Sequence, residues 1–259
     1  MALSLEGRVA LITGGSRGIG AATVRMFRAA GARVVFSYRA AEAEAQRLVA
    51  ECGGETVCRA VKQELASAED GGTLVDTAVA VWGRLDCLIV NHGVWPPRDA
   101  PIGSMADEQW RSTLAINLDS VFGLVRGGVA QMQRQSLVEG VRGHIVLVAS
   151  TAAQRGEAFH ADYAASKGAL LSLTKSLSSE LAGEGIYANC VAPGWVETEM
   201  SAAALKHPET SKKVLATIPL GRAARTEEIA GPILFLCTPM AGFVSGEIFN
   251  VNGGAVLVG

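Results

Sequence analysis

The stretch TGGSRGIG, Thr13 to Gly20, decides the fold of this chain. It follows an apolar run at residues 8–12, which has the length of a buried strand, and it leads into residues 18–30, which have helical periodicity. Glycines between a strand and a helix let the backbone turn sharply and let an anion approach the main chain. The free N–H groups and the positive dipole end at a helix start favour a phosphate. The stretch therefore predicts a site for the pyrophosphate of a dinucleotide.

The alternation of strand and helix continues along the chain. Apolar runs predict strands at residues 8–12, 33–38, 56–61, 86–90, 143–149, 186–192 and 247–251. Helical patterns lie between them at residues 18–30, 41–51, 68–82, 107–134, 162–182 and 226–237. Strict alternation indicates parallel strands joined by right-handed crossovers, with helices on both faces of the sheet. We expect one α/β domain over residues 1–259, a doubly wound Rossmann domain of about seven parallel strands, with a small substrate lid near residues 198–220.

Composition argues against several other classes of protein. Of the 259 residues, 49% are hydrophobic and 19% charged, which suits a buried parallel sheet. A net charge of −2 gives no basic field, so we expect no nucleic-acid or membrane partner. No apolar stretch approaches the roughly 18 residues of a membrane span. Five cysteines without CxxC spacing predict reduced thiols in a cytoplasmic protein, and four unpaired histidines predict no metal site.

A second motif, YAASK at Tyr163 to Lys167, lies in a segment with helical periodicity. Tyrosine and lysine four residues apart share one face of a helix. An ammonium near a phenol favours the phenolate, so Lys167 is expected to lower the pKa of Tyr163 from its usual value near 10 and to make it a useful acid and base. Such a pair also occurs by chance on many helices, where it is structural.

Other polar residues favour the catalytic interpretation. Ser150 ends the apolar strand HIVLVAS, thirteen residues before Tyr163, where its hydroxyl would enter a cleft. Asn117 lies in the helical stretch STLAINLDSVF, and a buried amide there needs a partner. VNHG at residues 90–93 and VAPGWVET at residues 191–198 each follow a strand, where their backbone could lie beside a cofactor.

With these motifs in order, residues 5 to 254 resemble the short-chain dehydrogenase/reductase family, and within it the 3-oxoacyl-reductase branch. The matching elements are TGGSRGIG, VNHG where the family usually shows NNAG, Asn117, Ser150, Tyr163-x-x-x-Lys167, PG at 193–194, and VNGG near the C-terminal end. The resemblance implies hydride transfer between a nicotinamide and a carbonyl or secondary alcohol on a small molecule.

The resemblance also implies a role for each catalytic residue. Tyr163 would exchange a proton with the substrate oxygen, and Ser150 would donate a hydrogen bond to that oxygen. Lys167 would hold the nicotinamide ribose, and Asn117 would anchor a water that links Lys167 to solvent. The cofactor would lie against Gly14, Ser16, Arg17, Gly18, Ile19, Gly20, Tyr38, Arg39, Glu64, Asn91, Gly93, Tyr163, Lys167, Pro193, Gly194, Val196 and Thr198.

The end of the second strand indicates which nicotinamide cofactor is used. NAD enzymes of this fold usually have an acid there, whereas this chain has Tyr38 followed by Arg39. Two arginines, Arg17 and Arg39, could hold a 2′-phosphate with charge-assisted hydrogen bonds, so we predict NADP(H). The alternative is that both arginines are solvated and that Tyr38 tolerates either cofactor. Glu64 stands where the family commonly has an aspartate beside the adenine, which leaves that contact open.

The substrate and the assembly are less closely defined. Trp95, Phe159, His160 and Trp195 would line a pocket for an apolar or ring-shaped ligand, or pack structurally. We favour a free small carbonyl or alcohol over a 3-oxoacyl carrier protein, because Glu184 stands near the place where carrier-protein reductases tend to have arginine. A nucleotide-sensing protein without turnover is less favoured. The resemblance implies a homotetramer formed through the helices near 107–134 and 162–182 and the C-terminal strand.

Overall fold

The computed structural model describes residues 3–257, so residues 1, 2, 258 and 259 of the expected domain lie outside the described residues. The described chain folds around one parallel seven-stranded sheet with the order β3-β2-β1-β4-β5-β6-β7. Its strands are β1 (Val9–Ile12), β2 (Arg33–Tyr38), β3 (Cys58–Lys62), β4 (Cys87–Val90), β5 (Gly143–Val148), β6 (Ile186–Pro193) and β7 (Ile248–Val251). The doubly wound Rossmann architecture expected from the sequence is thereby confirmed.

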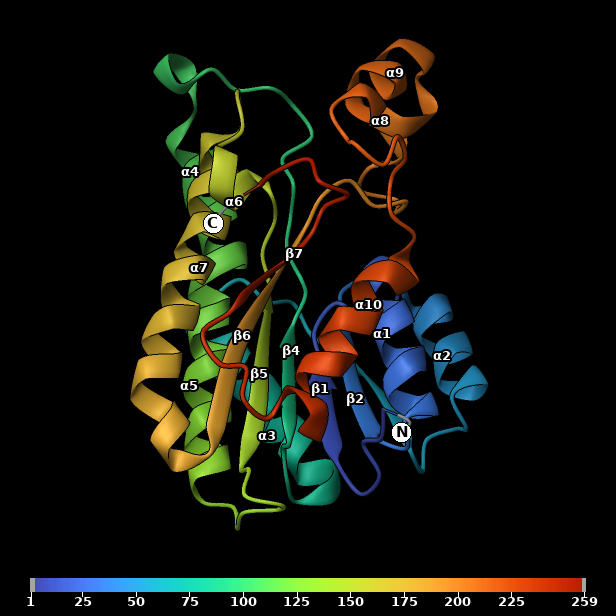
Figure 1. Cartoon of the computed structure of the whole chain (residues 1–259), viewed down its shortest axis with the longest axis vertical. Coiled ribbons are helices and arrows are strands. Elements are labelled where there is room, and N and C mark those ends of the chain that lie inside the picture. The colour runs from blue at the N-terminus through green and yellow to red at the C-terminus, as the bar shows by residue number, and fades with distance from the viewer. Residues whose placement is uncertain (1–2, 258–259) are drawn as a thin grey trace.

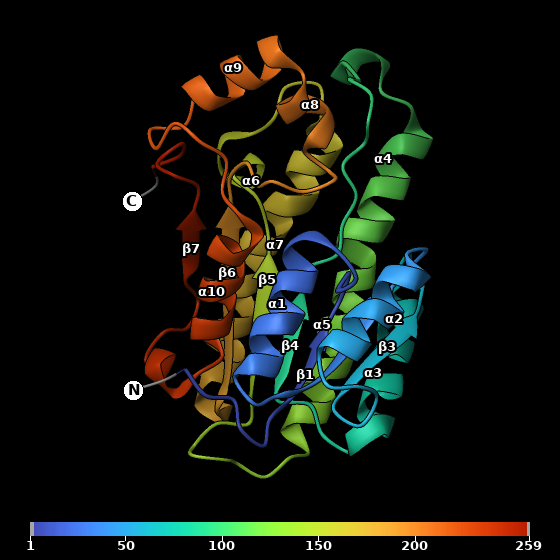
Figure 2. The same ribbon diagram turned by 90° about the vertical axis from the view of Figure 1, so that its right-hand side faces the viewer.

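Helices cover both faces of the sheet (Figures 1 and 2). One core cluster packs α1 (Gly18–Ala29), α2 (Glu42–Glu51) and α10 (Thr226–Leu236) on one face. The other packs α3 (Ala68–Trp82), α5 (Ser120–Gln133) and α7 (Ala161–Leu181) on the opposite face, where α4 (Asp107–Leu114) contacts α7. The central strands β1, β4 and β5 are buried along their whole length, and His144 in β5 is their one polar side chain.

Chain order places a ligand site at one edge of this sheet. Strand β1 pairs with β2 on one side and with β4 on the other, so the chain reverses its direction of winding between β1 and β4. Ligands in open α/β sheets bind beyond the carboxyl ends of the strands at such a switch point. The short helices α6 (Ala152–Arg155), α8 (Ala202–Lys206) and α9 (Pro208–Ala216) stand at this end of the molecule, and α8 and α9 form the 198–220 segment (Figure 1).

The structure differs from the expected element boundaries by more than one residue in two places. Strand β3 begins at Cys58, two residues later than expected, because a turn closed by the bond from Cys58 N to Gly54 O comes first. The single helix expected over residues 107–134 is divided by η2 (Ala115–Asp119), a π-helical turn. The remaining single turns are the 3₁₀ helices η1 (Ile102–Ser104), η3 (Ala182–Glu184) and η4 (Pro239–Ala241).

Candidate active site

The glycine turn, residues 13–20, joins β1 to α1 as the sequence predicts. A Cβ added at Gly20 would lie 2.1 Å from the Gly14 carbonyl oxygen, so the start of α1 packs directly on the turn. Gly18 has φ +54°, and a Cβ there would lie 3.3 Å from the Thr198 methyl group, in the space between the turn and the end of β6. No side-chain cap occupies the first turn of α1. Its N–H groups are therefore placed to bind an anion.

Asn91 supports this turn. Its side-chain amide donates to the carbonyl oxygens of Thr13 at 3.1 Å and Gly14 at 3.3 Å, and its backbone N–H donates to Thr13 Oγ1 at 3.0 Å. These bonds tie the end of β4 to the end of β1. Asn91, expected along the adenosine, thus also holds the backbone that would contact the cofactor.

His92 extends the same network toward the helix that carries Asn117. Its Nδ1 lies 2.8 Å from Thr13 Oγ1 and its Nε2 lies 2.8 Å from Ser120 Oγ. The Ser120 hydroxyl donates its proton to Ile116 O at 2.7 Å, so Ser120 must accept from His92 Nε2–H, and Nδ1 must accept from Thr13. Burial, together with the nearby Lys167 ammonium, lowers the pKa of His92 to about 3. The imidazole is a neutral brace between β1, β4 and η2.

The structure brings Tyr163, Ser150 and Lys167 together beyond the end of β5. Tyr163 and Lys167 lie one turn apart on α7 and are buried, at 8% and 4% exposure. Ser150 lies close enough to the phenol to lower its pKa, and the Ser150 Oγ accepts the N–H of Ala152 at 3.1 Å. Lys167 Nζ donates to the Val148 carbonyl oxygen at 2.8 Å. The end of β5 and one face of α7 therefore hold the three side chains together.

The pKa of the phenol moves opposite to the sequence-based expectation. Burial raises the pKa of Tyr163 above its usual value of 10.0, and the Ser150 hydrogen bond opposes that rise only in part. Burial also lowers the pKa of Lys167 from 10.5 to about 8. The two effects have one cause, because the dry pocket disfavours the charged form of both groups. At neutral pH Tyr163 is consequently a protonated acid.

Asn117 completes the cluster from the π-helical turn. Its Oδ1 accepts Val94 N–H at 2.8 Å, while its Nδ2 donates to Val94 O at 3.0 Å and to Ser166 Oγ at 3.1 Å. Gly93 leaves the room that this arrangement needs: a Cβ there would lie 3.2 Å from both Asn117 Oδ1 and Lys167 Nζ. The wide π turn is a feature often found at functional sites, and here it places a fully paired amide beside the lysine.

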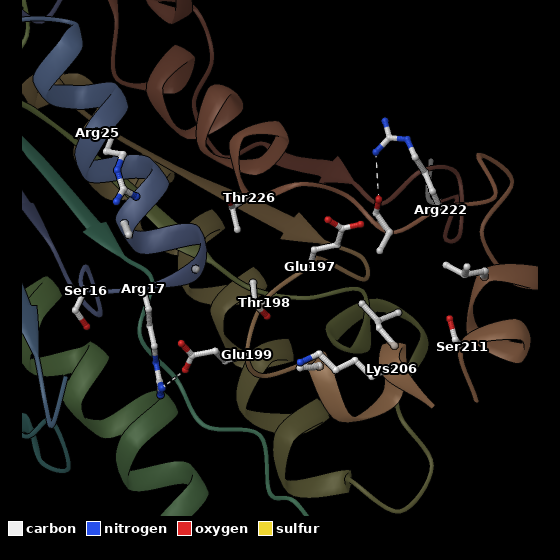
Figure 3. A pocket seen from close by; sticks show the side chains of 16 residues that line it. Ser16, Arg17, Arg25, Glu197, Thr198, Glu199, Lys206, Ser211, Arg222 and Thr226 are labelled. Atoms are coloured by element: carbon white, nitrogen blue, oxygen red, sulfur yellow. Dashed lines mark hydrogen bonds and ion pairs between the residues drawn. The ribbon is translucent and has the colours of Figure 1, made fainter. Parts of the chain in front are cut away.

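A cavity of about 750 Å³ lies between the glycine turn and the 198–220 segment (Figure 3). Ser16, Arg17, Gly18 and Thr198 line it, as the predicted cofactor site requires. Arg17 points across the cavity and pairs with Glu199, Nη1 to Oε2 at 2.5 Å (Figure 3).

The other predicted cofactor residues occupy the ends of neighbouring strands. Tyr38 is buried at the end of β2, whereas Arg39 and Glu64 are exposed. Gly194 backs onto Asn252, because a Cβ added at Gly194 would lie 3.0 Å from the Asn252 Cα. Of the remaining members, Ile19 lies in the first turn of α1, Pro193 is the last residue of β6, and Val196 follows that strand.

An aromatic wall borders Tyr163. Trp95 stacks on His160 with ring centroids 3.9 Å apart and meets the Tyr163 ring edge-on at 4.8 Å. His160 is held by Pro96 O, 3.0 Å from its Nε2. Phe159 has φ +64° and is half-exposed beside this wall, an unusual backbone conformation for a phenylalanine. Trp95 and His160, both predicted from the sequence to line the substrate pocket, therefore stack on each other beside Tyr163.

Sequence reasoning missed Thr13, His92 and Ser120, which brace the site, and Glu199, which pairs with Arg17. Only the histidine in VNHG, in place of the usual alanine, could have drawn attention to the brace. Among residues 3–257, no three His, Cys, Asp or Glu side chains gather as a metal site would require. Within the same residues, every helix is too short or too polar to cross a bilayer.

Comparison with known proteins places this geometry in a family. A family model described as Enoyl-(Acyl carrier protein) reductase matches residues 14–256. A 3-oxoacyl-[acyl-carrier-protein] reductase of Synechocystis sp. is 36% identical over 258 residues, covering 98% of this chain and 99% of that protein.

Solved structures agree. A short-chain dehydrogenase/reductase from Brucella melitensis superposes with a TM-score of 0.89 at 35% identity, with all of both chains covered. The Pseudomonas aeruginosa RhlG/NADP complex superposes with a TM-score of 0.88 at 32% identity, with 98% of each chain covered. With the glycine turn and the Ser150–Tyr163–Lys167 cluster in place, the chain belongs to the short-chain dehydrogenase/reductase family.

Proposed function

We propose that this protein is an NADP(H)-dependent oxidoreductase that interconverts a carbonyl and a secondary alcohol. The observation that carries the proposal is the cluster of Ser150, Tyr163 and Lys167, at the same end of the sheet as the glycine turn, where no side chain caps the first turn of α1. Gly18 has no side chain, so the space between it and Thr198 can admit a phosphate-bearing ligand. A Cβ at residue 18 would fill that space. When bound, the nicotinamide would supply the hydride.

The residues of the chain would handle the proton and the substrate oxygen. Tyr163, protonated at neutral pH, gives its proton to the oxygen of a carbonyl as the hydride arrives at the carbon. Ser150 holds the phenol and the oxygen in line. The Lys167 ammonium stabilises the phenolate left behind and, in the family, binds the nicotinamide ribose. A raised pKa keeps the phenol protonated at neutral pH, which is the form that a proton donor in carbonyl reduction needs.

The reaction is tested with a panel of carbonyl compounds and alcohols in both directions, following NADPH at its absorbance. Tyr163→Phe removes the proton donor and keeps the ring, so kcat should fall by roughly 10²–10⁴-fold. Cofactor binding should persist in this variant. A Tyr163→Phe enzyme that retains most of its activity would contradict the mechanism.

The choice of NADP(H) is supported by the absence of an acid at the end of β2, where Tyr38 and Arg39 stand. Arg39→Ala should lower kcat/KM for NADPH by about tenfold, as expected for one hydrogen bond to a charged group, and should leave NADH little changed. A preference for NADH that Arg39→Ala does not alter would refute the assignment.

The carrier-protein reaction is the second candidate, favoured by the naming of the Synechocystis relative. The argument against it from Glu184 is weaker in the structure. Eighteen residues of α7 separate Tyr163 from Leu181, about 27 Å at 1.5 Å per residue, so within one subunit Glu184 does not border the site. Comparing a 3-oxoacyl thioester on carrier protein with free ketones of similar chain length distinguishes the two substrates.

We propose that the protein assembles as a homotetramer. β7 is an edge strand, Phe243 just before it is fully exposed, and Phe122 on α5 is half-exposed. An exposed aromatic side chain before an open strand edge and another on a long helix each suit a subunit contact. Light scattering should give four times the chain mass, and a monomer at micromolar concentration would refute the proposal.

We also propose a cytoplasmic location. All five cysteines, Cys52, Cys58, Cys87, Cys190 and Cys237, are free and buried, as is usual in a reducing compartment. A thiol titration of freshly isolated, denatured protein should find five free thiols. Disulfides in that material would contradict this location.

A further inference from the structure

Arg17 and Glu199 form an ion pair between parts of the chain that are 182 residues apart. Arg17 belongs to the glycine turn and precedes α1, while Glu199 stands at the start of the 198–220 segment. In Figure 3 the two side chains point toward one another across the cavity, and the pair joins Arg17 Nη1 to Glu199 Oε2 at 2.5 Å. Both side chains are exposed, at 63% and 68%, so water and ligands reach them.

The proposed NADP(H) cofactor needs the same guanidinium. A 2′-phosphate is recognised by Arg through paired charge-assisted hydrogen bonds, and an N–H group that donates to a carboxylate is not available for this purpose. A carboxylate close to the phosphate also repels it. Glu199 therefore opposes the phosphate twice, once by holding Arg17 and once by its own charge.

Resting on the proposed function, we propose that Glu199 sets the affinity for the 2′-phosphate by competing with it for Arg17. The bound phosphate replaces the carboxylate on Arg17, and the Arg17–Glu199 pair breaks. NADH has no 2′-phosphate and leaves the pair intact. Glu199 thus acts as a specificity-determining residue that lowers the discrimination between NADPH and NADH.

The neighbouring charges supply a matched control. Glu197 lines the same cavity two residues earlier, but Glu199 is the carboxylate that pairs with Arg17. The cations of the other elements around the cavity are Arg25, which pairs with Glu51, Arg222, which pairs with Glu228, and Lys206. Removing Glu197 changes the general field of the cavity by one charge and leaves the Arg17 pair in place.

The test is a titration of full-length protein with NADPH and with NADH, following the fluorescence of the bound nicotinamide. Glu199→Gln should tighten NADPH binding by roughly two- to fivefold, the range expected for an exposed ion pair, and should change NADH binding no more than the control variant does. Glu197→Gln should change both cofactors alike and by less. In an Arg17→Ala background, Glu199→Gln should tighten NADPH binding only by the smaller amount that repulsion from the carboxylate charge costs, because the contested group is gone.

An unchanged dissociation constant for NADPH in Glu199→Gln would overturn the proposal. So would an equal gain for NADPH and NADH, which would reflect only the lost charge, or a full effect that survives Arg17→Ala. The assignment of NADP(H) is tested separately, on the wild-type protein. A wild-type protein that prefers NADH would refute the assignment of NADP(H), whereas the role of Glu199 is tested by NADPH binding to the variants.

Discussion

Replacing Lys167 with methionine should make the protein more stable while it abolishes activity. Burial lowers the pKa of Lys167 from 10.5 to about 8, and this difference corresponds to about 3 kcal/mol against holding the ammonium in the fold at neutral pH. Methionine removes that cost and fills a similar volume. It also leaves the Val148 carbonyl oxygen without the bond at 2.8 Å, which costs about 1 kcal/mol. The expected net gain is about 2 kcal/mol at pH 7.

The pH dependence identifies the cause. Below pH 8 both the folded and the unfolded protein hold the Lys167 proton, so the full cost applies. Between pH 8 and 10.5 the folded protein loses this proton first, so unfolding takes up a proton and the contribution of Lys167 to stability rises with pH. The advantage of Lys167→Met should therefore be largest at pH 7, fall as the pH rises above 8, and reverse by pH 10.5, where the lost bond to Val148 outweighs what remains of the cost.

Urea unfolding of wild type and variant at several pH values measures this difference, and subtracting the two curves removes the other titrating groups. Lys175→Met, at an exposed position two turns further along α7, is the matched control and should change stability little at any pH. A Lys167→Met protein that is less stable than wild type at pH 7, or an advantage that grows above pH 8, would refute the reasoning.

Three further changes have defined outcomes. Gly20→Ala places a Cβ 2.1 Å from Gly14 O, so it should cost about 1–3 kcal/mol in urea unfolding and weaken NADPH binding in titrations; binding at wild-type affinity would show that the turn adapts freely. The neighbouring Cys58 thiol and nearby arginines lower the pKa of the free Cys52 thiol to about 7, whereas burial raises the pKa of Cys237. Alkylation of native protein followed by mass spectrometry should modify Cys52 first, with a rate that rises through pH 7, and early labelling of Cys237 would contradict this order. Trp95→Ala opens the wall beside the catalytic tyrosine, so kcat/KM should rise for bulky ketones relative to acetone-sized ones, and an unchanged ranking would exclude this wall from the substrate site.

Features that depend on local sequence were predictable here. The strand at residues 143–149 and the helix containing Tyr163 each have one strong periodicity, and the structure places them within one or two residues of the expected limits. The spacing of Tyr163 and Lys167 needs only helical geometry to place both on one face. The glycine turn was predictable from its composition, because its glycines permit the sharp turn between strand and helix.

Contacts between distant segments were not predictable in the same way. The brace from Thr13 through His92 to Ser120 joins three elements, and the sequence around His92 does not show which residues this histidine connects. The pKa of the Tyr163 phenol depends on how much water the folded pocket excludes. The spacing of Tyr163 and Lys167 in the sequence gives no information on that burial. Arg17 has a partner 182 residues away, and only the folded chain reveals that carboxylate.

The π-helical turn η2 constrains how this chain can change its length. A π turn holds one residue more than the α-helical turn it replaces, so deleting a single residue from Ala115–Asp119 would leave a regular helix running from α4 into α5. Because the wide turn already accommodates its extra residue, α4 and α5 would keep nearly their present orientations, and the change would fall on Ala115–Asp119 itself. Asn117 lies in that turn, so it would lose its position against Val94 and Ser166. Insertions and deletions are therefore better tolerated in the loops around this helix pair than at its midpoint, even though the shortened helix would be the more regular one.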